Sequence, residues 1–470
     1  MTVKASSNER VASTEPVNAV SGIPQDPEPP APVRIGSTSA YQFAAQVVAL
    51  GVNFVVSVLI ARTLGPEGKG QLSVLQQVPG VLAVVLNFGL AYSNFYFVGR
   101  RKQPAGEALG NSILAALVAG IAGIPIVWLL TNGPLAVVPG LPVGGAIVAA
   151  VLLPVTLVAS FAVSVGNGLG LLKKASLANM ISTGLTLLLV LIAYAFDRLD
   201  VSTVLAISVI TGLASMGFVV AAMRTQLGRL SVRIAAFRES ARYSAKSYFG
   251  NLASYLNYRL DIILVGYLAG AASVGVYSIA VTFAELMWYV PNALSASILS
   301  KSMSLSGEDG ADVAARTARI TSLLMLVVCA AAAIVITPVI GIFYGEAFLP
   351  AVWPFLVLLP GVWSLGIAKI LNGYLAGHGR LFPWVSAAST ALNFAGNMVL
   401  IPVLGIVGAA LASTVSYTLG GAWSLWVFNQ ITGRGLGALL VPTGDDVRAV
   451  RSSAIDYIRS VRSAIGRSAG

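Results

Sequence analysis

Twelve apolar segments, separated by short polar stretches, follow one another along residues 40–428. Each is about as long as a helix that crosses a bilayer, which needs about 20 apolar residues. The pattern therefore predicts an all-α membrane protein with about twelve transmembrane helices. We expect these helices at Ala40–Ala61, Leu72–Val98, Ala108–Leu130, Val143–Gly168, Ser176–Phe196, Val201–Met223, Ser247–Ala269, Val274–Leu299, Ile320–Tyr344, Ala351–Ala376, Pro383–Ile401 and Val407–Phe428.

The polar stretches predict how the chain is organised. Residues 1–36 are rich in Ser, Pro, Glu and Asn, which is typical of a disordered tail, and they lack the apolar core of a cleavable signal peptide. Residues 37–223 and 247–428 would each form a six-helix half. Residues 224–246 place apolar side chains at helical spacing among arginines, which predicts a basic amphipathic linker on a membrane surface. Residues 429–470 show the same pattern, with a disordered end as the alternative.

Composition and charge predict the orientation. The chain is 56% hydrophobic and 10% charged, whereas a soluble domain carries about 25% charged residues. With the N-terminus in the cytoplasm, 24 lysines and arginines fall on the cytoplasmic side and three on the other. The positive-inside rule then places both termini in the cytoplasm. Because this rule accounts for the net charge of +11, we expect no nucleic-acid partner.

A segment that begins at Val58 recurs 205 residues later. Without gaps, Gly65 and Gly70 match Gly270 and Gly275, and apolar positions on either side of this pair of glycines match as well. Both copies contain the end of one span, a short loop and the start of the next, and six spans separate them. We therefore expect a parallel pseudo-repeat of two six-helix halves, an arrangement that encloses a central cavity.

Four charged residues fall inside the expected spans. Arg259 and Asp261 lie in the seventh, Glu285 in the eighth and Lys369 in the tenth. A charge at the bilayer centre costs a few kcal/mol, so such residues usually face a bundle interior or a wet cavity. Arg259 and Asp261 are two positions apart and point to different faces, which makes them poor partners. Glu285 could pair with Arg259 or with Lys369, and Lys369 could instead extend to the cytoplasmic interface.

The two copies of the repeat also carry a family resemblance. Leu59–Ser73 (L-I-A-R-T-L-G-P-E-G-K-G-Q-L-S) and Tyr258–Ala280 resemble the hairpins that begin each half of bacterial lipid-linked oligosaccharide flippases. These belong to the polysaccharide branch of the multidrug/oligosaccharidyl-lipid/polysaccharide superfamily. The resemblance implies a V-shaped cavity lined by cations, and transfer of an undecaprenyl-diphosphate-linked glycan to the periplasmic leaflet of the bacterial cytoplasmic membrane. By resemblance, Arg62 and Asp261 match motif residues of that family.

Such a substrate predicts roles for particular side chains. Its head must cross about 30 Å of hydrocarbon, and arginine suits the diphosphate because its planar fork gives two parallel bonds. We expect Arg259 and Lys369 to contact the head group, with Arg62 as a further cation. Asp261 and Glu285 would bind a coupling proton or sodium ion, or form a salt bridge. Polar side chains that would line the cavity, or alternatively hold helices together, are Gln46, Asn53, Asn251, Tyr255 and Asn372.

Two other functions remain open. A multidrug exporter of the same superfamily would favour acids in the cavity over buried cations. A membrane glycan polymerase or ligase needs large catalytic loops, and the longest outer loops here, residues 62–71 and 131–142, have about a dozen residues each. The sequence has no phosphate-binding loop, and one His and one Cys cannot form a metal cluster. We therefore expect a monomeric transporter rather than an enzyme, without metal or cofactor. Its partners would be the lipid-linked glycan, membrane lipids and the polysaccharide polymerase or export machinery.

Overall fold

The computed structural model describes residues 35–292, 294, 295, 308–375 and 382–441, and residues 443, 444, 446 and 448. The expected N-terminal tail and most of the expected C-terminal helix lie outside these residues. The elements are α1 (Ile35–Leu86), α2 (Leu90–Gly99), α3 (Ala105–Thr131), α4 (Val143–Gly168), α5 (Leu172–Ala195), α6 (Val201–Leu227), α7 (Ile234–Leu286), α9 (Glu308–Val339), a π-helical turn η1 (Ile340–Tyr344), a 3-10 helix η2 (Glu346–Ala351), α10 (Val352–Leu375), α11 (Phe382–Thr432) and α12 (Leu436–Leu440).

Nine helices in the described part of the chain are long and apolar enough to cross a membrane. Three of them, α1, α7 and α11, are each interrupted by one glycine with a non-helical backbone: Gly65, Gly270 and Gly405. Their φ angles of 65°, 81° and 58° lie in a region that residues with a Cβ atom rarely adopt. Each of these three helices therefore makes two passes, and the prediction of about twelve transmembrane helices is confirmed.

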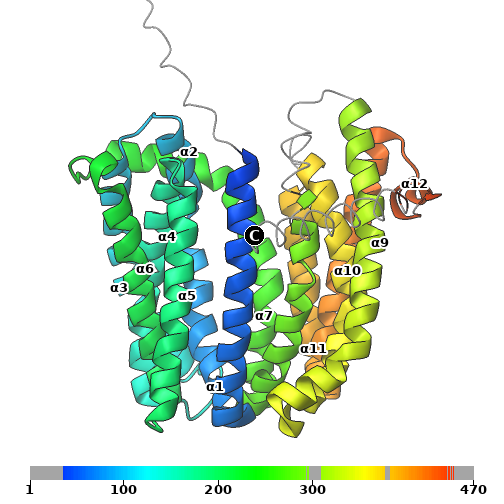
Figure 1. The fold of residues 1–470 in the computed structure, drawn as a ribbon, viewed down its shortest axis with the longest axis horizontal. Coiled ribbons are helices and arrows are strands. Elements are labelled where there is room, and N and C mark those ends of the chain that lie inside the picture. Colours follow the sequence, from blue (N-terminus) through cyan, green and yellow to red (C-terminus); the bar gives the residue numbers. More distant parts are fainter. Residues whose placement is uncertain are drawn as a thin grey trace, which may run out of the picture.

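The helices are arranged in two halves that stand side by side (Figure 1). Helices α1–α6 form the first half, α9–α11 belong to the second, and α7 lies between them. Large apolar side chains cover the outside; Val118, Ile121 and Ile334 are 62%, 67% and 78% exposed. Helices that are apolar on their outer face as well as inside suit a surrounding of lipid.

The two copies of the repeat meet at a pair of glycines. A Cβ atom on Gly70 would overlap the carbonyl oxygen of Ala271, and one on Gly275 would overlap the carbonyl oxygen of Pro66. Small residues allow this close backbone approach between helices in a membrane. Because Gly70 and Gly275 are equivalent positions, the crossing is nearly symmetric, and the predicted parallel pseudo-repeat is confirmed.

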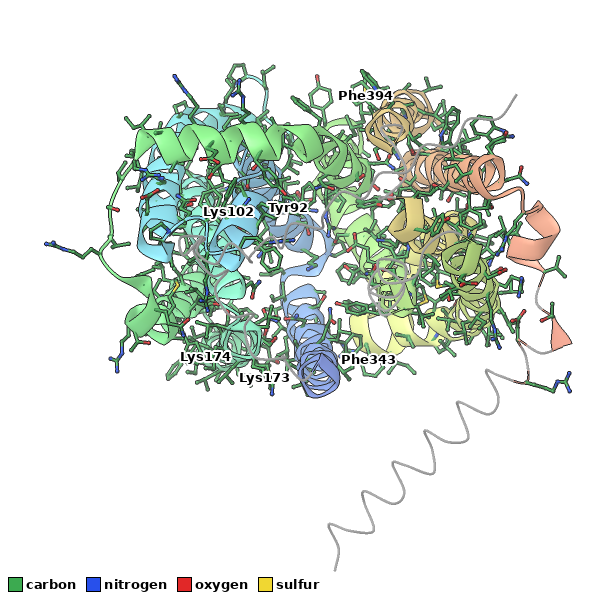
Figure 2. All side chains as sticks on the ribbon, turned by 90° about the horizontal axis from the view of Figure 1, so that it is seen from above. Tyr92, Lys102, Lys173, Lys174, Phe343 and Phe394 are labelled. Atoms are coloured by element: carbon green, nitrogen blue, oxygen red, sulfur yellow. The ribbon has the colours of Figure 1, made fainter. Side chains whose placement is uncertain are left out.

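The first part of α7, residues 234–246, lies across one edge of the first half (Figure 2). The Arg233 side chain is 3.4 Å from the Glu107 carboxylate, and the Asn111 amide exchanges two hydrogen bonds with the Arg233 backbone, of 3.2 and 2.9 Å. The Ser240 hydroxyl donates to Gln103 at 3.4 Å. These contacts fix the start of α7 on α3. We call this end of the molecule the basic end, because it carries exposed cations, which include Arg100, Arg101, Lys102, Lys173, Lys174 and Arg224.

At the opposite end, α1 is joined to η1 of the second half. The Arg62 guanidinium donates to the carbonyl oxygens of Phe343 (2.7 Å) and Ile342 (2.5 Å). The Tyr344 hydroxyl lies 3.2 Å from the Ser57 hydroxyl. Together with the glycine crossing, these bonds hold the halves together at this end.

The described C-terminal residues fold back onto α9. The carboxylate of Asp446, which is 1% exposed, accepts a 2.9 Å hydrogen bond from Arg319 and one of 2.7 Å from the Thr443 hydroxyl, and it lies 3.6 Å from Arg316. Burial alone would raise the pKa of Asp446, but the bonds from Arg319 and Thr443 lower it to about 2. The segment is thus tied to α9 by an ionised carboxylate at neutral pH.

Candidate functional site

The bend of α7 at Gly270 brings two charged side chains together. Arg259, before the bend, faces Glu285, after it: Nη1 is 3.0 Å from Oε1 and Nη2 is 3.1 Å from Oε2. This is the bidentate fork that arginine forms with a carboxylate. The two side chains are 28% and 27% exposed, so the pair lies between the helices and is still open on one side.

Lys369, on α10, stands over an aromatic wall next to this pair. Its ammonium nitrogen is 5.0 Å from the ring centre of Trp288 and 5.7 Å from that of Tyr258. Tyr417 packs edge-on against both rings, at 5.8 and 5.9 Å. The ammonium group is held over these rings rather than beyond the end of its helix. A cation over an aromatic face keeps its charge available to an anion on the other side.

Asp261 faces away from Arg259, as the two-residue spacing predicts, and is 1% exposed. Its carboxylate accepts hydrogen bonds from the Tyr277 hydroxyl (2.7 Å), the Ser413 hydroxyl (3.3 Å) and the Ile262 amide (2.8 Å). These partners come from both arms of α7 and from α11. The carboxylate therefore joins three transmembrane passes.

Two asparagines of α11 extend this network. The Asn393 amide donates to the Ser413 hydroxyl at 3.1 Å, and the Asn397 amide donates to Asn393 at 2.8 and 2.9 Å. Both asparagines are fully buried, and the Asn397 side-chain oxygen has no hydrogen-bond partner among the residues that the structure describes. A buried polar atom without a partner is costly, which makes this oxygen a candidate ligand for a cation or a water. We call Asp261, Asn393, Asn397 and Ser413 the buried oxygen cluster.

A cavity with both apolar and polar lining lies within the second half, near the basic end of α7, α10 and α11. Asn372 accepts a hydrogen bond of 3.1 Å from the Ser424 hydroxyl on its wall, and Tyr258 is shared with the aromatic wall under Lys369. Hydroxyl and amide groups dominate the polar lining, which consists of Ser254, Asn257, Asn372, Ser386, Ser389 and Ser424.

A second cavity lies between the halves. Asn251 and Tyr255 of α7 line one side, and Asn87 and Tyr92 line the other. Tyr255 is one helical turn before Arg259. This cavity therefore lies next to the charged pair. Its lining extends to Tyr92 of α2, a helix at the basic end (Figure 1).

The remaining residues that the sequence singled out lie elsewhere. Arg62 is bonded to the carbonyl oxygens of η1, so the structure does not bring it together with Arg259 and Lys369. Gln46 and Asn53 have exposed side chains on the first part of α1.

Sequence reasoning did not include the partners of Asp261. Asn393 and Asn397 are four positions apart, on one face of an apolar span, and that spacing is the signal that could have found them. The pairing of Asp261 with Tyr277 and Ser413 has no local signal, because it depends on how separate helices pack.

Comparisons with known proteins found relatives of this chain. A family model described as polysaccharide biosynthesis protein matches residues 36–295. The chain is 25% identical over 402 residues to the probable low-salt glycan biosynthesis flippase Agl15 of Haloferax volcanii, which covers 82% of this chain and 81% of that one.

Solved structures share the fold at lower identity. An inward-facing multidrug resistance transporter of the MATE family in the MOP superfamily aligns with a TM-score of 0.65 at 15% identity, over 84% of this chain and 99% of that one. The lipid II flippase MurJ, in an inward closed conformation, aligns with a TM-score of 0.65 at 15% identity, over 85% and 90% of the two chains.

Proposed function

The chain belongs to the polysaccharide biosynthesis protein family, and from this premise we propose that it is a flippase that moves a polyprenyl-diphosphate-linked oligosaccharide across a membrane by alternating access. The relative from Haloferax volcanii, a probable glycan biosynthesis flippase, supports this assignment. The observation that carries it is the pair of intramembrane cations, Arg259 and Lys369, placed beside cavities whose walls contain amide and hydroxyl groups.

The substrate chemistry explains why these groups belong together. The polyprenyl tail can stay in lipid, whereas the diphosphate and the sugars need a polar path through about 30 Å of hydrocarbon. The Arg259 fork matches two phosphate oxygens, and Lys369 adds a point charge. Glu285 occupies the fork in this structure. In the proposed cycle an arriving diphosphate displaces Glu285, and release restores the pair.

We propose that the basic end faces the cytoplasm, which places both termini there. The support is the excess of Lys and Arg in the loops at that end. The membrane would be the bacterial cytoplasmic membrane, as the resemblance of the sequence implies, and the glycan would move toward the outer leaflet. The contacts of Arg62 and of the glycine crossing then close the outer side in this conformation.

We further propose that the buried oxygen cluster couples the cycle to a sodium or proton gradient. Oxygen ligands suit hard cations, and intramembrane carboxylates commonly bind coupling ions. Asp261 is two residues from Arg259 on the same helix, so binding at the cluster and binding of the diphosphate act on one segment of α7.

The test is transport in proteoliposomes, with a fluorescent short-chain polyprenyl-diphosphate oligosaccharide as the probe. We expect Arg259→Ala to abolish transfer and Arg259→Lys to retain part of it. Arg198→Ala, which changes an exposed loop arginine, is the matched control and should behave like the unmodified protein. Normal transfer by Arg259→Ala would refute the proposal, as would transfer of cationic drugs in place of the glycan lipid.

A second assay addresses coupling. Transfer is measured with an imposed sodium gradient and, separately, with an imposed proton gradient. One of the two should accelerate the unmodified protein, and Asp261→Asn should remove that acceleration. Acceleration that persists in Asp261→Asn would rule out the cluster as the coupling site.

A further inference from the structure

Three tyrosine rings form a stack at the basic end. The rings of Tyr96 and Tyr243 are 4.5 Å apart with an interplanar angle of 18°, and those of Tyr92 and Tyr243 are 6.2 Å apart at 6°. Tyr92 and Tyr96 lie on α2, whereas Tyr243 belongs to the first part of α7. The buried ring of Phe97 packs edge-on against Tyr243 at 5.2 Å. The stack therefore joins two segments that are distant in sequence, and the buried Phe97 ring supports Tyr243.

One member of the stack is open. Tyr92 is 52% exposed and also lines the cavity between the halves, together with Asn87, Asn251 and Tyr255. In Figure 2 it lies on the side of the first half that faces the second. An aromatic belt residue would face the lipid headgroups instead. Tyr92 thus presents a ring next to amide and hydroxyl groups, inside the proposed path.

Two cations lie next to the Tyr96 ring of the stack. The Arg100 guanidinium carbon is 5.7 Å and the Lys102 ammonium nitrogen is 5.8 Å from the ring centre of Tyr96, and both side chains are exposed. These cations belong to the basic end and are separate from the pair at Arg259. An anionic group next to a stacked ligand would be attracted here.

We propose that this tyrosine stack is a sugar subsite, in which the apolar face of one pyranose ring of the substrate packs on Tyr92. Amphipathic rings pair an apolar face with polar edges, and the asparagines of the cavity can take the sugar hydroxyls. Arg100 and Lys102 favour a sugar that carries a carboxylate. The inference rests on the proposed flippase function and specifies which part of the substrate, the sugar, the first half binds.

Tyr92→Ala is the test variant, because its open ring braces the stack less than Tyr96 or Tyr243. We expect its KM for the glycan lipid to rise about tenfold, from the loss of one apolar ring face of contact, and its transfer of the sugar-free polyprenyl diphosphate to stay unchanged. Tyr92→Trp should keep the low KM. Phe95→Ala, which removes a ring that is 49% exposed on the same helix, is the matched control.

Saturation-transfer NMR tests the subsite without transport. Methyl glucoside and methyl glucuronoside are the probes, added to the full-length protein in detergent. Both signals should weaken in Tyr92→Ala and persist in Phe95→Ala. The glucuronoside signal should be the stronger one, and it should lose that advantage in the double variant Arg100→Gln with Lys102→Gln.

The outcomes separate the two ideas. If Tyr92→Ala binds both sugars and transfers the glycan lipid like the unmodified protein, the subsite is refuted, while loss of transfer in Arg259→Ala would still support the flippase. If the unmodified protein binds the sugars through Tyr92 but transfers no lipid, the flippase proposal fails and the subsite stands. Equal losses for sugar-free and glycosylated lipid in Tyr92→Ala would also overturn the subsite, because they would indicate a structural role.

Discussion

Replacing Glu285 with glutamine should tighten the binding of a diphosphate lipid, although it removes a charged residue from the site. In the structure both terminal nitrogens of Arg259 are bonded to Glu285, at 3.0 and 3.1 Å. A ligand that uses this guanidinium must first break the pair. Glu285→Gln keeps the shape of the side chain and weakens its hold on Arg259.

The size of the effect follows from the exposure of the pair. Fully exposed ion pairs contribute about 0–1 kcal/mol, whereas removing one partner of a buried pair costs about 3–5 kcal/mol. Arg259 and Glu285 are 28% and 27% exposed, between these limits but open to screening. We therefore assign about 1–2 kcal/mol to the competition between Glu285 and the diphosphate for Arg259. Removing this competition in Glu285→Gln corresponds to a decrease in the Kd of the diphosphate lipid of about 5- to 30-fold.

The assay is equilibrium binding of farnesyl diphosphate to the protein in nanodiscs at low salt. Glu285→Gln should bind more tightly than the unmodified protein, and Arg259→Ala should bind more weakly. The double variant should match Arg259→Ala, because the effect of Glu285 acts through Arg259. An unchanged or weaker affinity in Glu285→Gln would refute the competition. Tighter binding that persists without Arg259 would assign the effect to Lys369 instead.

Three further expectations concern the rest of the fold. Gly275→Ala should destabilise the protein by about 1–3 kcal/mol in thermal unfolding, because its Cβ atom would overlap the facing helix, whereas Gly184→Ala on α5 has open space and should be neutral or slightly stabilising. Arg62→Gln should increase thiol labelling of a cysteine at position 57, because the bonds between α1 and η1 are lost; unchanged labelling would mean that these bonds do not hold the end shut. The pKa of Asp446 is lowered to about 2 by its bonds from Arg319 and Thr443, so its stabilising effect is complete above about pH 4 and is lost as the pH falls toward 2. Asp446→Asn should therefore expose the C-terminal segment to proteolysis at neutral pH, and equal cleavage of variant and unmodified protein would contradict this.

The spans and the repeat could be predicted because their signals are local. An apolar segment of about 20 residues identifies a crossing wherever it packs. Glycines at fixed spacing identified the equivalent hairpins, and the structure shows two physical reasons for them. Gly65 and Gly270 adopt backbone angles that favour glycine, and Gly70 and Gly275 permit the helix crossing.

The pairings within the site could be predicted only in part. The sequence left Glu285 with two cationic partners, Arg259 and Lys369. The choice depends on how the bend at Gly270 sets one arm of α7 against the other. The bend places Arg259 opposite Glu285 and leaves Lys369 to the aromatic wall. No pattern in either arm alone specifies that register.

The tyrosine stack also depends on a contact between separate segments that the sequence pattern does not predict. Tyr243 lies in the basic linker, where helical spacing among arginines predicted contact with a membrane surface. In the structure this linker also packs on the protein, because Glu107 and Asn111 of α3 hold the start of α7. The spacing of apolar residues does not predict this contact. The ring of Tyr243 then reaches Tyr96, which is remote in sequence.

These features meet on one continuous segment. Helix α7 carries Tyr243, Arg259 and Asp261 before its bend at Gly270, and no residue between them interrupts the helix. Its first part lies across the edge of the first half, whereas the part with Arg259 and Asp261 crosses between the helices (Figure 2). Tyr243 and Arg259 are 16 residues apart, so the helix separates them by at most about 24 Å. In the proposed cycle, a substrate with its sugar at the stack and its diphosphate at Arg259 would lie along this segment. The buried oxygen cluster, fixed between α7 and α11, would then determine whether the part of α7 that carries Arg259 moves with the first half or with the second.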